Sequence, residues 1–232
     1  MIDGVDWDCE VLKNYADKNL GCIKRVSSGL DWAFSQVESA ILLEDDCLPH
    51  PSFFNFCETL LYHYWDDERV WVISGNNFQD GQCRGDGSYY FSHYNHCWGW
   101  ASWQRAWKHY DHNLEQWESL KKSGLLNSIF DNSYERQYWY RIWERLYYEK
   151  EPDSWNYCWF FTCVINSGLS VLPNVNLVSN IGFGPNGTHT VTEKKLSNMA
   201  VSEIAEIKYT SFILRNKTAD LYTFKHKLGG DK

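Results

Sequence analysis

Three consecutive carboxylates, Glu44, Asp45 and Asp46, follow directly after the apolar run Ala40–Leu43. A short run of this kind predicts a strand that is buried on both faces of a parallel sheet. Open α/β sheets bind ligands beyond the carboxyl ends of their strands, so the triplet would lie at such a crevice. In an extended chain Glu44 and Asp46 point to the same side and Asp45 to the other. Their oxygens suit Mg²⁺ or Mn²⁺, which can bridge a diphosphate; the alternative is a solvated acidic loop.

The elements around the triplet predict an α/β fold. Residues 11–38 contain two helix-like stretches, and the second has a helical face of Leu30, Ala33, Phe34 and Val37. After the triplet, Ser52 is expected to cap a helix from Phe53 to about Tyr64, which leads to a strand over residues 70–74. This order predicts a strand–helix–strand crossover of the parallel type. Further strands are expected at 89–91 and 169–172, with helices between 103 and 150.

Length and composition favour one folded domain. The 232 residues are 44% hydrophobic and 22% charged, which excludes a disordered chain and a membrane protein. We expect a domain over 1–192 and a polar tail over 193–232 that packs on it or extends from it. The formal net charge of −8 disfavours nucleic-acid binding. The first six residues carry no basic or long apolar signal, so we expect a cytoplasmic protein without a membrane span. The eight cysteines form no C-x-x-C pair and are expected to be mostly buried free thiols.

Five sequence blocks occur in an order that resembles the nucleotide-diphospho-sugar transferases of the GT-A fold. The stretches 19–22, 25–32 and 41–49, followed by Phe53-Phe54, are most similar to bacterial glycosyltransferase-like proteins. More distantly, the blocks 44–46, 53–54, 73–76, 98–100 and 153–155 resemble the N-acetylglucosaminyltransferase I family. The resemblance implies a GT-A-like, Rossmann-related mixed sheet flanked by helices. It also implies a metal-dependent glycosyltransferase that moves a sugar from a UDP- or GDP-sugar to a hydroxyl of a glycan or other acceptor.

The same resemblance implies a metal and donor site. Asp46, with Glu44 and the late histidine His189, would bind Mn²⁺ or Mg²⁺. The residues expected to contact the donor are Asp45, Arg25, Trp98 and Gly99. Three of these residues have a simpler alternative: a packed aromatic turn for Trp98, a solvated basic residue for Arg25, and an exposed loop residue for His189.

Asp153 matches the acidic residue that such families use as general base, which takes a proton from the acceptor hydroxyl in an inverting displacement. The alternative is that Asp153 caps the helix that begins in the sequence Pro152-Asp153-Ser154-Trp155. The two roles are compatible. Glu151 is the substitute if the alignment is shifted.

The amino-terminal part departs from the family pattern. The resemblance implies a first strand and helix that hold the nucleotide base, and Val5–Val11 is the only candidate segment, so we expect an amino-terminally truncated domain. A missing first strand would leave a free sheet edge, which favours a homo-oligomer or a partner chain that completes the site. A second hypothesis is therefore a catalytically inactive carbohydrate-binding or assembly module, consistent with the 13 Trp and 15 Tyr residues. A hydrolase that uses Asp46 and Asp153 is a more distant third.

Overall fold

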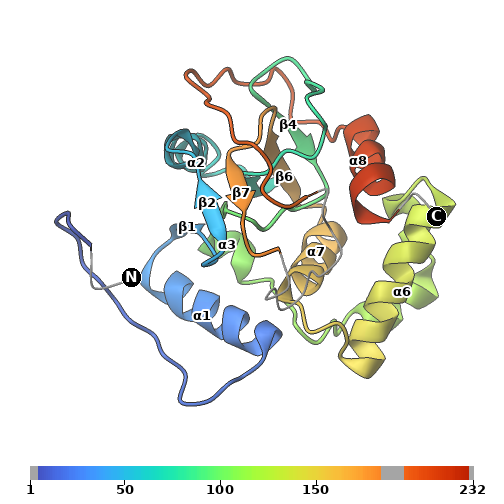
Figure 1. Ribbon diagram of the computed structural model, residues 1–232. Helices are drawn as coiled ribbons and strands as arrows, with labels where there is room; N and C mark the ends of the chain where they lie inside the picture. The colour runs from blue at the N-terminus through green and yellow to red at the C-terminus, as the bar shows by residue number, and fades with distance from the viewer. Residues whose placement is uncertain (1–4, 184–195, 230–232) are drawn as a thin grey trace.

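A five-stranded mixed sheet forms the centre of the computed structural model, which describes residues 5–183 and 196–229 (Figure 1). Its strand order is β1 (Ser39–Leu42), β5 (Trp100–Trp103), β3 (Val70–Ser74), β6 (Leu169–Pro173) and β4 (Tyr89–Ser92). Only β3 and β6 are parallel neighbours, and the other three neighbouring pairs are antiparallel. A second, two-stranded antiparallel sheet pairs β2 (Cys47–Pro49) with β7 (Val178–Asn180). The predicted mixed α/β architecture, with a mixed sheet flanked by helices, is confirmed.

Strand β1 differs from the doubly buried strand that the sequence predicted. Its four residues are only half-buried, and it pairs in antiparallel fashion with β5. Within the described part of the chain no strand pairs with its other side. The cause is the position of β5, which lies between β1 and β3 and is antiparallel to both. The crossover therefore joins two parallel strands that are not neighbours, and it leaves β1 at the edge of the sheet.

Helix α2 (Ser52–His63) covers one face of the sheet. It buries Phe53, Phe56, Cys57, Leu60 and Leu61, the spacing of a single apolar helical face. This face packs with residues of β3, β4 and β5 in one core. The predicted cap role of Ser52 is wrong, because Ser52 is the first helical residue. Its hydroxyl contacts Nδ1 of His50 and accepts a hydrogen bond from the Ile204 N–H instead.

Helices α1 (Cys22–Gln36), α3 (Gln104–Trp107) and α7 (Trp155–Ile165) pack against the opposite face of the sheet. Only the second of the two helix-like stretches in 11–38 is helical. Residues 5–20 form neither helix nor strand and run along the outside of α1 (Figure 1). Val11, Leu12 and Tyr15 are exposed there. Because a short helix without a packing partner is marginal in water, the apolar spacing alone does not produce one.

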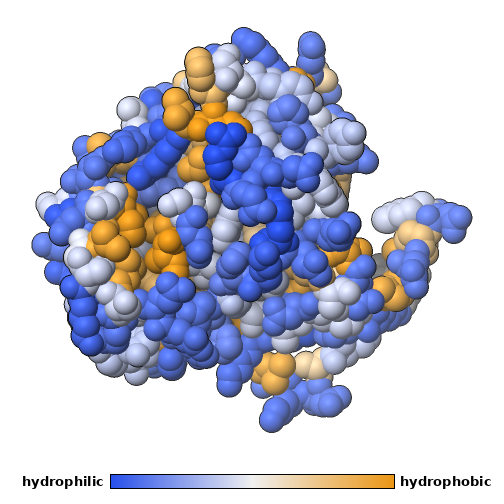
Figure 2. All heavy atoms as spheres, turned by 180° about the vertical axis from the view of Figure 1, so that it is seen from behind, coloured by the Kyte–Doolittle hydropathy of each residue, from blue (hydrophilic) through white to orange (hydrophobic). Residues whose placement is uncertain are grey.

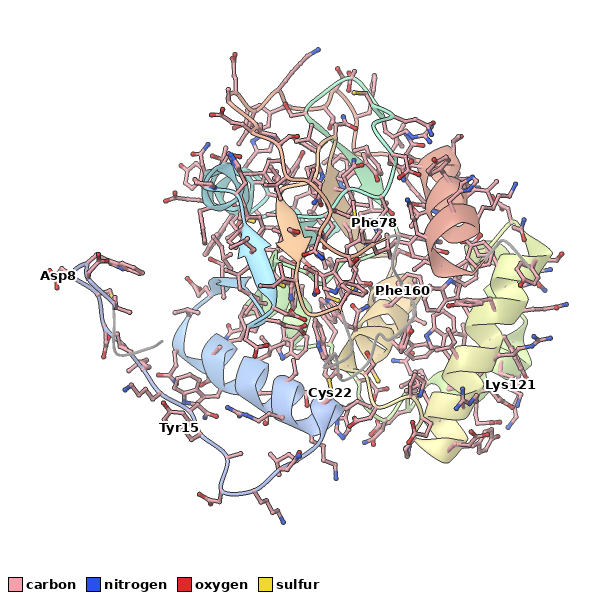
Figure 3. The ribbon with its side chains drawn as sticks, viewed as in Figure 1. Asp8, Tyr15, Cys22, Phe78, Lys121 and Phe160 are labelled. Atoms are coloured by element: carbon pink, nitrogen blue, oxygen red, sulfur yellow. The ribbon has the colours of Figure 1, made fainter. Side chains whose placement is uncertain are left out.

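A third core consists mainly of aromatic side chains between four helices. These are α4 (Trp117–Ser123), α5 (Leu126–Ile129), α6 (Ser133–Glu149) and α7. Trp117, Trp143 and Phe160 are almost completely buried in it. Figure 3 places Phe160 on α7 and Lys121 outside this core. Much of the high Trp, Tyr and Phe content therefore fills cores.

The part of the chain from residue 196 packs on the body of the protein. Leu196, Ile204 and Phe224 are buried. The last elements are α8 (Lys217–Thr223) and the π-helix η2 (Phe224–Leu228), and α8 lies against β4. Figure 2 shows a mainly hydrophilic surface with separate apolar patches. Among residues 5–183 and 196–229, no helix combines the length and the apolar composition that crossing a bilayer requires.

A buried polar network connects β4 to α6 and α8. Asp220 accepts hydrogen bonds from the Ser92 hydroxyl and, at 2.6 Å, from Nε of Arg215. The ring of His93 lies 3.6 Å from Glu135 and 3.8 Å from Asp220, and the Arg215 guanidinium is 3.3 Å away. Burial lowers the pKa of His93 to about 4, although Asp220 opposes this shift. Burial also lowers the pKa of His96 to about 3.

These two histidines predict a loss of stability in mild acid. Below the ordinary histidine pKa of about 6.5 the unfolded chain binds protons that the folded protein does not, so acid favours unfolding. Between pH 6 and 5 each histidine is expected to lower the free energy of unfolding by about 1 kcal/mol. Urea unfolding across this range measures the slope. His96→Gln should reduce it and the exposed control His112→Gln should not, and an unchanged slope in both variants contradicts the prediction.

Candidate functional site

The acidic triplet forms a β-turn between β1 and β2. The N–H of Cys47 donates to the carbonyl oxygen of Glu44 at 3.1 Å, which closes the turn. Glu44 and Asp45 are exposed, while Asp46 is partly buried. The chain bends there, so the extended-chain alternation from which Glu44 and Asp46 were expected to share a side does not apply. The turn does follow the carboxyl end of β1, as predicted.

Glu44 is fixed to the first residue of α7. The indole N–H of Trp155 donates to Glu44 Oε1 at 3.1 Å. Trp155 is itself buried and stacks on Trp100 of β5, with 5.4 Å between the ring centroids. This contact joins the acidic turn to the segment that carries Asp153, although Asp153 lies 109 positions after Glu44 in the chain.

Asp46 lies against the end of the segment that follows β7. Its carbonyl oxygen accepts a hydrogen bond of 2.9 Å from the Ile181 N–H. A Cβ atom on Gly182 would lie only 2.2 Å from Oδ2 of Asp46. Glycine at position 182 is therefore what allows the Asp46 carboxylate to occupy this place.

Asp153 caps a helix, but not the one that the sequence predicted. Its two carboxylate oxygens accept hydrogen bonds from the N–H groups of Cys22 and Ile23, at 2.8 and 2.9 Å. These groups begin α1, and Figure 3 shows Cys22 at that end of the helix. Its own helix, α7, begins at Trp155 without a side-chain cap. The carboxylate thus satisfies two otherwise unpaired helix N–H groups and favours the positive end of the α1 dipole.

Three thiols lie among these carboxylates. Burial, together with the smaller effects of Asp46 and Glu44, raises the pKa of Cys47 to about 12. Burial also raises the pKa of Cys22, with contributions from Asp153 and Glu44. The pKa of Cys97 is raised mainly by burial and also by Glu44. Because thiolates are disfavoured next to carboxylates, these cysteines are poor candidates for nucleophiles at neutral pH.

Trp98 and Gly99 lie beside the turn. The ring of Trp98 is half-buried and meets Phe78 and Phe183 edge to face, at 5.6 and 5.2 Å. Gly99 has a φ of 71°, and a Cβ atom there would lie 2.7 Å from Val178 and 3.3 Å from Leu43. Gly99 thus lies between Val178 of the second sheet and Leu43, the residue before Glu44. The absence of a side chain at position 99 lets these two segments pack closely.

A pair of glycine variants separates strain from packing. Gly99→Ala is expected to lower the free energy of unfolding by about 2–5 kcal/mol, the sum of left-handed backbone strain and overpacking. Gly124 has a φ of 72° and no atom within 4 Å of an added Cβ, so Gly124→Ala should cost only the strain of about 1–2 kcal/mol. Urea denaturation of both variants measures the difference. Equal losses would show that Val178 and Leu43 do not restrict position 99.

The remaining predicted site residues lie elsewhere. Arg25 donates to the side chain of Asn14 at 2.9 Å and also to its carbonyl oxygen, so it binds the segment before α1. Among the described residues, the hydrogen bonds of the Arg25 guanidinium are to Asn14 and not to the acidic turn. Glu151 is exposed, and its N–H faces the Arg145 carbonyl oxygen at 3.5 Å. His189 lies outside the described residues.

The carboxylates of the turn fit a hard cation in part. Within residues 5–183 and 196–229, no group of three His, Cys, Asp or Glu side chains is arranged to hold a metal ion. Mg²⁺ is usually bound by one or two carboxylates together with substrate phosphates and water. Asp46 and Glu44 supply oxygen ligands of this type, so the donor set suits a cation that binds together with a diphosphate.

Sequence reasoning missed three residues of this arrangement: Trp155, Cys22 and Gly182. Gly21-Cys22 and Trp155 belonged to quoted blocks, but nothing local indicated what they contact. No family model matches the chain, and no curated protein matches it. Geometry and residue chemistry therefore carry the functional assignment.

Proposed function

We propose that the protein is a metal-dependent glycosyltransferase that moves a sugar from a UDP- or GDP-sugar to an acceptor hydroxyl with inversion. The observation that carries the proposal is the hydrogen bond between Trp155 and Glu44. It holds the acidic turn next to the segment that contains Asp153. We therefore assign the carboxylates suited to a metal–diphosphate complex and the carboxylate suited to act as base to one site.

In this proposal Asp46 and Glu44 hold Mn²⁺ or Mg²⁺. When bound, the cation offsets the negative charge of the departing nucleoside diphosphate. Asp45, at the exposed tip of the turn, faces the donor from the solvent side. Trp98 and Gly99 lie next to the proposed donor site. Trp98 contacts Phe183, and Gly99 lies close to Leu43, the residue before Glu44.

Asp153 acts as the general base. Its carboxylate takes the proton of the acceptor hydroxyl while the hydroxyl oxygen bonds to the anomeric carbon and the bond to the diphosphate oxygen breaks. The N–H groups of Cys22 and Ile23 use one lone pair on each oxygen and leave others to accept the proton. They also hold the carboxylate in place.

Isothermal titration calorimetry with UDP and GDP tests the donor site. Wild-type protein is expected to bind one of them in Mn²⁺ and at least tenfold more weakly in EDTA. Asp46→Ala should show the weaker binding in both conditions. Asp66→Ala, which removes an exposed carboxylate at the end of α2, is the matched control and should behave as wild type.

The opposite pattern contradicts the proposal. Glycan binding that persists in EDTA and in Asp46→Ala, with no binding of either nucleotide, would fit a catalytically inactive carbohydrate-binding module. Size-exclusion chromatography with light scattering, performed on the same samples, reports whether a homo-oligomer accompanies binding.

A further inference from the structure

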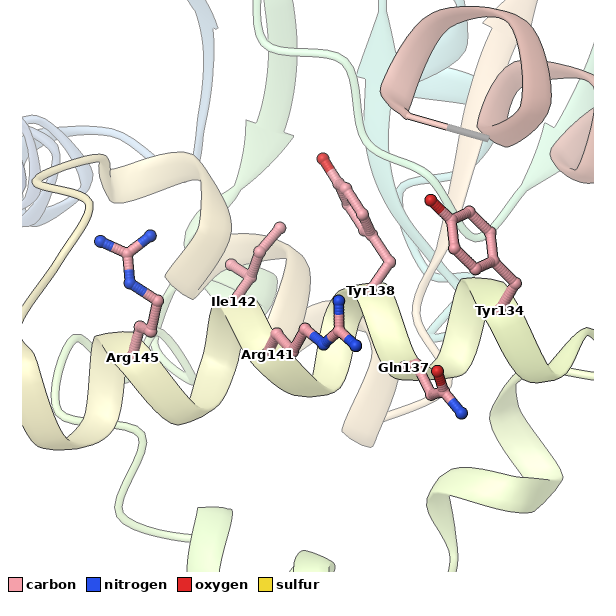
Figure 4. Close-up of a pocket in the computed structure, with 6 residues that line it drawn as sticks. All are labelled: Tyr134, Gln137, Tyr138, Arg141, Ile142 and Arg145. Carbon is pink, nitrogen blue, oxygen red and sulfur yellow. The ribbon is translucent and has the colours of Figure 1, made fainter. Parts of the chain in front are cut away.

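A groove of about 270 Å³ runs along one side of α6. Figure 4 shows Tyr134, Tyr138, Ile142 and Arg145 on the same side of this helix, with Arg141 beside them. Each of the first four comes one position before a buried residue of α6, so the groove borders the aromatic core. From Tyr134 to Arg145 the helix rises about 17 Å.

The two ends of the groove differ in chemistry. At one end the rings of Tyr134 and Tyr138 pack against Phe224 of η2, with centroids 5.8 and 5.5 Å apart. At the other end lies the guanidinium group of Arg145, beyond the apolar side chain of Ile142 (Figure 4). The Arg141 side chain runs back along the helix, so that its guanidinium lies near Tyr138. The groove thus offers fixed aromatic rings with one cationic group beside them and a second at the far end.

Both guanidinium groups are available to an anion. Arg141 is exposed and makes no hydrogen bond or ion pair with another described residue. Arg145 pairs with Glu149 at 3.2 Å, but both side chains are more than half exposed. Such surface pairs contribute little, about 0–1 kcal/mol, so a ligand can replace Glu149. The positive charge of the groove is local, since the chain as a whole carries a charge of −8.

We propose that this groove binds an acidic saccharide, one that carries a carboxylate, sulfate or phosphate group. The flat tyrosine rings suit the apolar face of a sugar ring, and a guanidinium makes paired hydrogen bonds to an oxyanion. A volume of about 270 Å³ is near the lower limit of small-molecule sites, about 300–1,000 Å³, which fits a short saccharide.

The acidic saccharide is the acceptor substrate, and this assignment rests on the proposed glycosyltransferase function. Arg145 lies in the last turns of α6, and Asp153 follows four residues after the helix ends. A saccharide that extends from the tyrosines past Arg145 continues toward the segment that carries Asp153. Binding in the groove itself requires neither the metal nor the donor.

Binding measurements in EDTA, without nucleotide, therefore test the groove separately from the transferase. The probes are a trigalacturonate, its carboxyl-reduced neutral counterpart, a hexose 6-phosphate and inorganic phosphate. We expect the trigalacturonate or the sugar phosphate to bind at least tenfold more tightly than the neutral sugar and inorganic phosphate. Binding of the trigalacturonate would indicate a carboxylated ligand, and binding of the hexose 6-phosphate would indicate a phosphorylated one.

Charge variants localise the binding. Arg141→Gln and Arg145→Gln should each weaken it about tenfold, because each removes a charge-assisted contact. Arg69→Gln, which removes an exposed arginine far along the chain, should leave it unchanged. Equal binding of the neutral sugar, unchanged binding in Arg141→Gln, or equal weakening in Arg69→Gln overturns the proposal. If the protein binds the acidic saccharide but shows no Mn²⁺-dependent nucleotide binding, the groove is a saccharide site. In that case only the assignment of the saccharide as acceptor is contradicted.

Discussion

Asp153→Asn is expected to lower the rate of nucleoside diphosphate release by about 10²–10⁴, the usual contribution of a general base. Asparagine keeps one acceptor oxygen for the start of α1, but its amide nitrogen cannot accept the second N–H. The substitution therefore also weakens a helix cap, at a cost of about 1 kcal/mol. The rate is measured with whichever UDP- or GDP-sugar the wild-type protein turns over. A wild type that turns over none contradicts the proposed function itself.

A matched control separates the base from the cap. Asn132 caps α6 by accepting hydrogen bonds from two backbone N–H groups, at 2.9 and 3.0 Å. Asn132→Ala should therefore lower stability by a similar amount, about 1 kcal/mol, without the loss of rate. In Asp153→Asn the acid limb of the pH–rate profile, which reports protonation of the base, should disappear. If the two variants lose equal activity, or if the acid limb remains, Asp153 is only a cap.

Asp220→Ala is expected to lower the free energy of unfolding by about 3–5 kcal/mol. Asp220 is 1% exposed and accepts hydrogen bonds from Ser92 and Arg215. Its removal leaves the guanidinium of Arg215 without its carboxylate in a largely buried place, and such broken pairs cost this amount. This is a large part of the 5–15 kcal/mol that stabilises a typical domain.

Asp131→Ala is the control for this prediction. Asp131 pairs with Lys217 at 2.7 Å, but both side chains are at least 65% exposed, so the loss should be about 0–1 kcal/mol. Urea unfolding gives both values. If Asp220→Ala does not fold, Asp220→Asn, which keeps the shape and one acceptor, provides an intermediate value. Similar losses at positions 131 and 220 would contradict the assignment of this network as a major source of stability.

Local patterns predicted the elements whose formation depends on local spacing. The strand at 70–74 and the helix that begins near Ser52 lie where the apolar periodicity places them. The position of β1 could not be predicted in this way, because it depends on β5, whose residues lie about sixty positions further along the chain. A short apolar run indicates a strand but not its neighbours.

The site shows the same limit. The sequence indicated two compatible roles for Asp153, as a base and as a cap, but the helix that it caps begins 131 positions earlier. The indole of Trp155 binds Glu44 across 111 positions of sequence, and no local pattern identifies this contact. The turn at 44–47 was missed because the alternation rule assumes an extended chain. Contacts across a hundred residues are determined by packing, which a single sequence does not display.

The bond between Asp153 and the start of α1 provides a probe that needs no substrate. The amide protons of Cys22 and Ile23 are held by the same carboxylate that is proposed to act on the acceptor. Their rate of exchange with deuterium therefore reports how often this end of the helix opens. Each such opening also releases Asp153 from its fixed position. Slow exchange at these two amides would accordingly mark a preparation whose site is assembled, before any ligand has been identified.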